Sequence, residues 1–394
     1  MSILEKKNPM HRRDFVKLGS IIAATAVHSE VYGGEIPQKR AMTVSKTVDF
    51  INDGVPLSPK EYGELLMKLA DEGKIKTDFY SNGGVVEELE NRFAKLMGKE
   101  SSVFMPTGTL ANHMALRRLA GNNRRVILQE QSHIYQDTGD GCQTLSALNL
   151  IPLGLNTTEM TLAEIEEVVD KTGKGRVALK VGVISIESPV RRQQDTLFAF
   201  QNMKAITAYA KANGIKTHLD GARLFIQSAH TGIDPASYGA MFDTSFTSIC
   251  KCFNAASGAV LAGSKEFTQD LFHERRMFGA GIPAVWPFAA VALHYVDSWI
   301  EEYKSAWQKA EYLFSEIQKD ERYKIVKYQN GSHIVHLDLK NIDKKRLSDA
   351  LAKRNIRLSA PDATGFNLKV NISMNRMTAQ EITGSFKEAM KEVG

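Results

Sequence analysis

Two short stretches of the sequence carry residue types that could do chemistry together. The first runs from His218 to Arg223 (HLDGAR), and the second places Lys251 inside the apolar run Ile-Cys-Lys-Cys-Phe. Residues 215–219 and 243–250 are each predicted to form a buried strand, so Asp220 and Lys251 follow strand ends. Their separation of 31 residues is about the length of one strand–helix–strand step.

A carboxylate after one strand and a lysine after the next suit pyridoxal 5′-phosphate (PLP). The lysine forms a Schiff base with the PLP aldehyde, and the acid keeps the pyridine nitrogen protonated. The apolar neighbours of Lys251 would partly desolvate it and favour the neutral, nucleophilic amine. The alternative is an ordinary lysine whose head reaches water, together with an aspartate that caps the next helix.

A second set of groups could hold the phosphate and the ring. Residues 102–105 are predicted to form a strand that leads through Thr107-Gly108-Thr109 into a helix, and backbone N–H groups at such a helix start bind phosphate. Taken alone, this turn is also typical of a simple helix cap. His133 follows the predicted strand 125–129 and could lie on a cofactor ring or move a proton; the alternative is a structural histidine.

Elements that must position these groups alternate between strand and helix from about residue 85 to 265. Such alternation predicts an α/β fold, with a mostly parallel sheet and helices on both faces. The candidate groups lie at or just after strand C-terminal ends, where such sheets bind ligands. After this alternating region we predict a helix over 265–278, a long, bent helix over 283–319 and a small α+β domain. The proposed domains are therefore 48–285, a large PLP-binding domain, and 286–394, a small C-terminal domain.

Composition limits the other possibilities. The chain has 394 residues, 43% hydrophobic and 24% charged, with a formal charge of +5 that owes much to the N-terminus. The body is thus nearly neutral, and nucleic acid is not an expected partner. Three cysteines without spacing patterns predict neither a disulfide framework nor a metal site. Cys250 and Cys252 are expected to share one strand face.

The N-terminus resembles a twin-arginine export signal. Arg12 and Arg13 precede Phe15, Lys17 and a mildly apolar run that is too short to cross a membrane. We therefore expect a signal peptide over 1–26, a polar tether over 27–47 and a periplasmic mature protein without a membrane segment. The alternative is a basic, disordered arm on a cytoplasmic protein, which cell fractionation would distinguish.

Four blocks in order resemble the threonine aldolase / aromatic amino acid β-eliminating lyase family, whose members are fold-type I PLP enzymes. The similarity spans about 49–374. The blocks are PTGTLAN (106–112), SHI (132–134), HLDGARLF (218–225) and the region of Lys251 that ends GAVLAG (258–263).

The resemblance implies roles for individual residues. Lys251 would carry the cofactor, Asp220 would pair with the pyridine nitrogen, and His133 would stack on the ring. Gly108 and Thr109 would hold the phosphate. Arg223 would lie near the phenolic oxygen of the cofactor ring or near the substrate carboxylate, and Asn52 and Lys369 correspond to substrate-binding positions. The family also implies a homodimer or homotetramer, in which the Tyr80 loop and Arg275 or Arg276 would reach the partner subunit.

The sequence departs from the family at the positions closest to the substrate. Asn52-Asp53-Gly54 replaces Ser-Asp-Thr, and Ser188-Pro189-Val190 replaces Asn-Thr-His, with Arg191 and Arg192 next. Three functions therefore stay open. They are retro-aldol cleavage of a β-hydroxy amino acid to glycine and an aldehyde, β-elimination or transamination, and a non-catalytic exported binding protein.

Overall fold

The computed structural model describes residues 45–394. The predicted export signal and residues 27–44 of the predicted tether lie outside this part of the chain. Within it, no helix is both long enough and apolar enough to cross a membrane.

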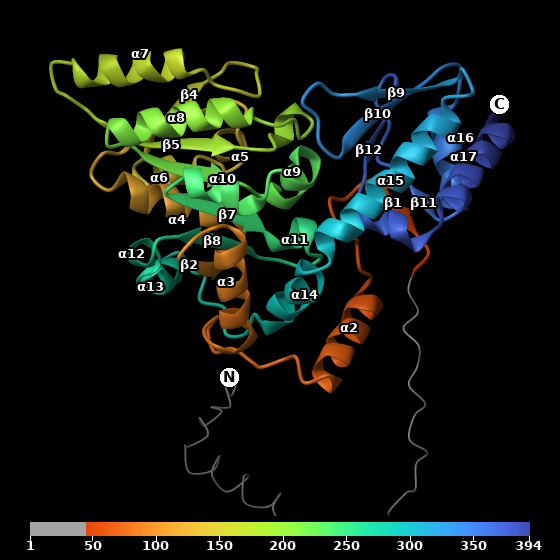
Figure 1. Ribbon diagram of the computed structural model, residues 1–394, viewed down its shortest axis with the longest axis horizontal. Coiled ribbons are helices and arrows are strands. Elements are labelled where there is room, and N and C mark those ends of the chain that lie inside the picture. Colours follow the sequence, from red (N-terminus) through yellow and green to blue (C-terminus); the bar gives the residue numbers. More distant parts are fainter. Residues whose placement is uncertain (1–44) are drawn as a thin grey trace, which may run out of the picture. The chain divides into compact units, whose positions relative to one another are not determined.

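The described chain contains one large and one small sheet besides a two-stranded pairing (Figure 1). The strands are β1 (Val48–Asp49), β2 (Ser101–Met105), β3 (Arg125–Gln129), β4 (Asn149–Leu153), β5 (Val181–Glu187), β6 (Lys216–Asp220), β7 (Thr244–Ser248), β8 (Ala259–Gly263), β9 (Tyr323–Lys327), β10 (Ile334–Leu339), β11 (Ile356–Arg357) and β12 (Gly365–Lys369). The helices of eight or more residues are α2 (Pro59–Asp71), α3 (Gly84–Leu96), α4 (Gly108–Ala120), α7 (Leu162–Gly173), α8 (Phe200–Ala212), α9 (Leu224–Thr231), α14 (Trp286–Val296), α15 (Trp299–Ile317), α16 (Lys344–Ala352) and α17 (Ala379–Val393).

The large sheet has seven strands in the order β2-β8-β7-β6-β5-β3-β4. Strand β8 is antiparallel to both of its neighbours, and the other pairs are parallel. The prediction of a mostly parallel α/β sheet is therefore confirmed. Strands β5, β6 and β7 lie side by side, and Glu187 pairs directly with Asp220. The C-terminal ends of the strands that carry the candidate site thus meet at one edge of the sheet.

Helices cover both faces of this sheet because its central strands are apolar on both sides. Ile184 and Ile186 of β5 pack into a core shared with α3, α8 and α9, whereas Val183 packs into a core on the α4 side. Every residue of β5 is buried. This two-sided burial explains why β5 reads as a continuous apolar run instead of an alternating one.

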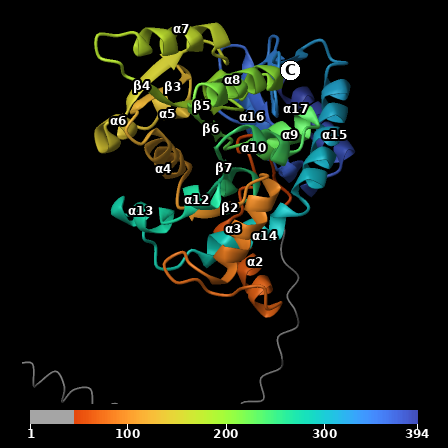
Figure 2. The same ribbon diagram turned by 60° about the vertical axis from the view of Figure 1, so that its left-hand side comes forward.

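The small domain is built around the antiparallel sheet β12-β10-β9. Helices α15 and α17 lie side by side against it in both views (Figures 1 and 2). Strand β1 belongs to the same core, because it pairs with β11 and its Val48 packs with Leu313 and Phe366. The start and the end of the described chain therefore build this domain together.

Three elements differ from the sequence prediction. The long helix expected over 283–319 is two helices, α14 and α15. Side chains of α14 pack in the core of the large sheet, whereas those of α15 from Ala306 onward pack in the small-domain core, so the break lets each half face its own core. The helix expected over 265–278 is likewise split, into α12 (Lys265–Thr268) and α13 (Leu271–Met277). The strand expected to run to Cys250 ends at Ser248. The domain limits 48–285 and 286–394 stay a prediction.

Candidate active site

A cavity of about 240 Å³ opens where β5, β6 and β7 end. It collects groups that are far apart in the sequence but were predicted to meet. Its lining includes Gly108, Thr109, His133, Glu187, Asp220, Arg223 and Lys251. Of the predicted site residues, only Asn52 and Lys369 are not part of this lining.

Asp220 ends β6 and is 2% exposed. Its Oδ2 accepts a hydrogen bond from Nδ2 of Asn112 at 2.6 Å, and its Oδ1 accepts one from the backbone N–H of Ala222 at 3.2 Å. The following helix, α9, has Arg223 at its N-cap position and no side-chain capping hydrogen bond, so Asp220 does not cap it. The interpretation of Asp220 as a helix cap is therefore wrong, and its carboxylate is held at the cavity by side-chain and backbone donors.

A relay of buried hydrogen bonds through Asn112 and His218 holds the Asp220 carboxylate in place. Burial lowers the pKa of His218 to about 3, so its imidazole is neutral. Since Oδ1 of Asn112 can only accept, Nε2 of His218 donates to it at 2.9 Å, and Nδ1 of His218 accepts from Thr244 at 2.8 Å. The Asn112 amide is thereby oriented with its NH₂ toward Asp220. Sequence reasoning placed Asn112 and His218 in recognisable blocks but did not predict this contact.

Lys251 lies in a single helical turn, α11 (Ile249–Cys252), which begins directly after β7. Burial, followed by the charge of Arg223, lowers the pKa of Lys251. This direction agrees with the expectation of a partly desolvated amine. The expected common face of Cys250 and Cys252 is wrong, because residues two apart on a helix point different ways: Cys250 is exposed and Cys252 is buried.

The start of α4 forms one wall of the cavity. Thr107 caps the helix by accepting a hydrogen bond from Leu110 N–H at 3.1 Å. A Cβ atom on Gly108 would lie 3.0 Å from the Phe246 ring, so glycine lets this helix start pack tightly against β7. Thr109 Oγ1 lies 3.3 Å from Nε2 of His133, which places the histidine beside the helix start. N–H groups, a hydroxyl and an imidazole therefore converge here.

Glu187 is a cavity residue for which the sequence suggested no role. It ends β5 and is 4% exposed. Its two carboxyl oxygens accept hydrogen bonds from the backbone N–H groups of His133 and, at 2.9 Å, of Arg191. Burial, and then the neighbouring Asp220, raise the pKa of Glu187 to about 8. A glutamate at the end of a buried strand was the only available sequence signal.

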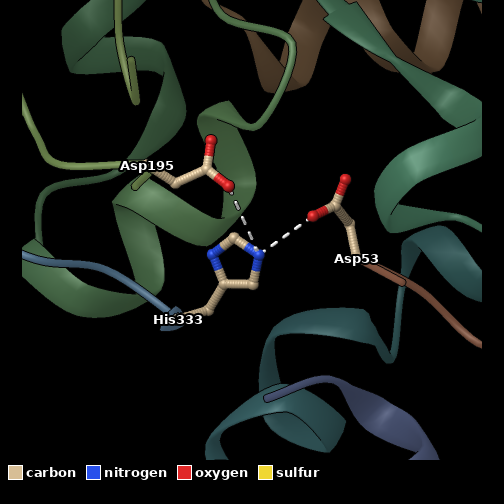
Figure 3. Close-up of side chains that lie close together, drawn as sticks. All are labelled: Asp53, Asp195 and His333. Atoms are coloured by element: carbon tan, nitrogen blue, oxygen red, sulfur yellow. Dashed lines mark hydrogen bonds and ion pairs between the residues drawn. The ribbon is translucent and has the colours of Figure 1, made fainter. Parts of the chain in front are cut away.

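Arg223 is buried and forms two ion pairs, with Asp53 at 2.9 Å and with Asp195 at 3.3 Å. Burial opposes its charge, but Asp53 and then Asp195 raise the pKa of Arg223 overall. Figure 3 shows His333 between the same two carboxylates, with its Nε2 at 3.0 Å from Asp53 and 3.8 Å from Asp195. Such a set of two carboxylates and a histidine could hold a metal ion. In this structure Arg223 and Lys369 supply the positive charge that balances the two carboxylates, which is the charge a metal ion would bring.

Lys369 and Asn52 lie on the small-domain side of this network. Nζ of Lys369 is 3.2 Å from Asp53, and Nδ2 of Asn52 donates to Asp49 at 3.0 Å. Asn52 lines a second cavity of about 310 Å³, which shares Lys251 with the first. The structure thus places Asn52 beside a cavity that Lys251 also lines, while Lys369 is linked to the network through Asp53.

Asp53 forms ion pairs with residues of both domains, and its replacement is expected to lower the free energy of unfolding. Burial opposes its ionisation, but Arg223, His333 and Lys369 lower the pKa of Asp53 well below 3.8. Asp53→Asn leaves the buried Arg223 with one carboxylate fewer, so we expect a loss of about 3–5 kcal/mol in the free energy of unfolding. Because the pKa of Asp53 is lower in the folded state, this contribution is present above pH 3.8 and is lost as the pH falls further.

Urea unfolding of Asp53→Asn measures this effect. The matched control is Asp297→Asn, since Asp297 forms an ion pair with Arg92 but is 70% exposed at its side chain. That control should cost no more than about 1 kcal/mol. Equal unfolding free energies for the two variants would contradict the structural role of Asp53.

The expectation that Arg275 reaches a partner subunit is not supported. Arg275 is 1% exposed and donates hydrogen bonds to the carbonyls of Phe104 and Ser81, so it holds the Tyr80 loop of its own chain. Arg276 lies over the Tyr80 ring at 5.1 Å. The homo-oligomer stays a prediction.

A known protein family matches more than half of the chain. Residues 69–340 match the beta-eliminating lyase family. The low specificity L-threonine aldolase of Saccharomyces cerevisiae is 27% identical over 230 residues, which are 58% of this chain and 59% of the yeast enzyme. The chain therefore spans less than two thirds of the length of this curated relative.

Solved structures extend the likeness over most of the chain. A Listeria monocytogenes EGD-E protein, titled a "putative L-allo-threonine aldolase", has a TM-score of 0.70 and 26% identity; the match covers 88% of this chain and 97% of that one. A serine palmitoyltransferase variant from S. paucimobilis, solved with a bound PLP–myriocin aldimine, has a TM-score of 0.60 at 17% identity over 88% of each chain, which shows the shared fold alone. The fold is that of fold-type I PLP enzymes, and the chain belongs to the beta-eliminating lyase family.

Proposed function

We propose that the protein is a PLP-dependent lyase that cleaves a β-hydroxy amino acid to glycine and an aldehyde. The observation that carries this proposal is the single cavity shared by Lys251, Asp220, His133 and the start of α4. The likeness to threonine aldolases supports the choice of reaction.

The chemistry of the cavity lining fits PLP. Lys251 offers an amine of lowered pKa for the aldehyde, and Asp220 offers a fixed, buried carboxylate for the pyridine nitrogen. The N–H groups of Gly108 and Thr109 at the start of α4 fit the phosphate. The aldehyde, the pyridine nitrogen and the phosphate of the cofactor therefore each have a partner of suitable chemistry in one cavity.

When bound, PLP supplies an aldehyde that joins the substrate amine and a ring that takes up electrons from the breaking bond. The protein supplies the remaining steps. Asp220 holds a proton on the pyridine nitrogen, and the Asn112–His218 relay keeps its carboxylate oriented. His133, which lines the same cavity, takes the proton from the β-hydroxyl and so lets the Cα–Cβ bond break. Lys251 is the amine that the substrate displaces and the base available at Cα.

Product identification by mass spectrometry tests this proposal. The holoenzyme is incubated with threonine, allo-threonine, phenylserine and serine. Glycine together with the matching aldehyde is the expected result. A keto acid with ammonia would instead indicate β-elimination, for which Lys251 is the natural base. PLP loading without amino-acid binding would indicate a non-catalytic binding protein.

Export to the periplasm is proposed on the sequence of residues 1–26 alone, and detection of the mature protein only in the cytoplasmic fraction would refute it.

A further inference from the structure

The mouth of the cavity carries a pair of arginines that the mechanism does not use. Arg191 and Arg192 follow β5 in a short 3-10 turn, and their side chains are 43% and 41% exposed. Both guanidinium groups bind the carboxylate of Asp137. Only Arg191 lines the cavity that contains Lys251 and Asp220.

These three side chains do not balance in charge. Asp137 contributes one negative charge, and Arg191 and Arg192 contribute two positive charges. Burial opposes the ionisation of Asp137, but Arg191 and then Arg192 lower its pKa, so it stays ionised. One positive charge is therefore uncompensated at the mouth of the cavity, beside His133, whose Nδ1 lies 3.5 Å from Asp137.

Apart from Lys251, the other cationic side chains next to the cavity are already paired within the protein. Arg223 binds Asp53 and Asp195, and Lys369 also binds Asp53. The buried Glu187 carboxyl accepts a hydrogen bond from the backbone N–H of Arg191 at 2.9 Å. This bond fixes the position of the Arg191 backbone from which the side chain extends. Val190, just before it, is fully buried. Arg191 is thus the first residue after Glu187 whose side chain reaches the cavity, and it is anchored there.

We infer that the substrate carries an anionic group on its side chain, which Arg191 binds. This inference rests on the proposed function and names its substrate class: a β-hydroxy amino acid with a carboxylate on Cβ. The simplest member is 3-hydroxyaspartate. Breaking its Cα–Cβ bond leaves the electron pair on Cα, which then takes a proton to give glycine. The β-hydroxyl loses its proton as its oxygen becomes the carbonyl of glyoxylate.

The kinetic test compares kcat/KM for 3-hydroxyaspartate and threonine in the holoenzyme. We expect wild type to favour 3-hydroxyaspartate, and Arg191→Gln to reduce that preference by about 10- to 100-fold, the range of one charge-assisted hydrogen bond. Arg192→Gln is the matched charge control, because it removes the same positive charge beside Asp137 from a side chain that does not line the cavity. Its preference should fall less than that of Arg191→Gln, since the Arg191 guanidinium stays in the cavity to bind the anion. Equal preferences in wild type and Arg191→Gln would overturn the inference.

A binding test separates this inference from the proposed reaction. Calorimetry with aspartate and asparagine, which differ in side-chain charge but hardly in shape, should show tighter binding of aspartate to wild type and a reduced difference in Arg191→Gln. This holds even if neither ligand turns over. The cofactor phosphate is a second anion that Arg191 could bind, and a titration with PLP tests this. If Arg191→Gln bound PLP more weakly than wild type but kept the preference for aspartate, Arg191 would be assigned to the cofactor phosphate and the inference would be overturned.

Discussion

Replacing Lys251 by alanine is expected to lower turnover by about a thousandfold or more, an increase of about 4 kcal/mol in the activation barrier. Lys251 is the one amine in the cavity shared with Asp220 and His133, among the residues that the structure describes. Without it, PLP has no lysine to hold it covalently, and Cα has no neighbouring base. Borohydride reduction of the wild-type holoenzyme followed by peptide mapping should place the label on Lys251.

Lys99 is the matched control for this experiment. Burial lowers the pKa of Lys99 to about 8, so it too is partly neutral and could react with an aldehyde. It lies outside the cavity, however, and donates hydrogen bonds to the carbonyls of Phe242 and Asp243. Lys99→Ala should therefore retain the label and the turnover. Two results would refute the assignment of Lys251 as the cofactor lysine. One is a borohydride-reduced cofactor found on Lys99, and the other is normal turnover by the Lys251→Ala enzyme.

Replacing Asp220 by asparagine should lower kcat by about two orders of magnitude or more, on the order of 3 kcal/mol. A carboxylate beside the pyridine nitrogen holds a proton there by charge, and this matters most when the ring accepts electrons. Asparagine can still accept the hydrogen bond from Asn112, but it cannot hold the proton by charge. The variant is expected to fold and to bind PLP, with a modest decrease in Tm.

A true capping aspartate provides the comparison for this variant. Asp234 begins the helix α10 (Pro235–Met241) and accepts a hydrogen bond from Ser237 N–H at 2.8 Å. Because asparagine caps helices about as well as aspartate, Asp234→Asn should change neither kcat nor Tm appreciably. If Asp220→Asn lowered Tm clearly while kcat stayed intact, Asp220 would be structural and the catalytic role would be wrong.

The part of the site that follows from strand order could be predicted from the sequence. Asp220 and Lys251 end or follow neighbouring parallel strands, and Gly108 begins a helix that packs against the same strands. The geometry of a parallel sheet brings such positions to one edge, regardless of the conformation of the connecting loops. The order of apolar runs and turns was therefore enough to predict that these three would share a cavity.

Contacts that depend on the small domain could not be predicted in this way. Asp195 and His333 meet at Arg223 because a loop after β5 and the start of β10 pack together, and no periodic pattern encodes that packing. The single helical turn that carries Lys251 was also missed. Its sequence is apolar and follows a strand directly, so a short helix and a strand extension look alike over so few residues.

The pairing of β1 with β11 has a consequence for how the chain is made. Val48 pairs with Ile356, near the other end of the described chain. During synthesis, β1 leaves the ribosome long before its partner exists, whereas the strands of the large sheet lie between them in sequence and can assemble first. The small domain is therefore completed last, and a chain that stops before Ile356 leaves Val48 and Phe50 without strands β11 and β12 and helix α17, which belong to the same core.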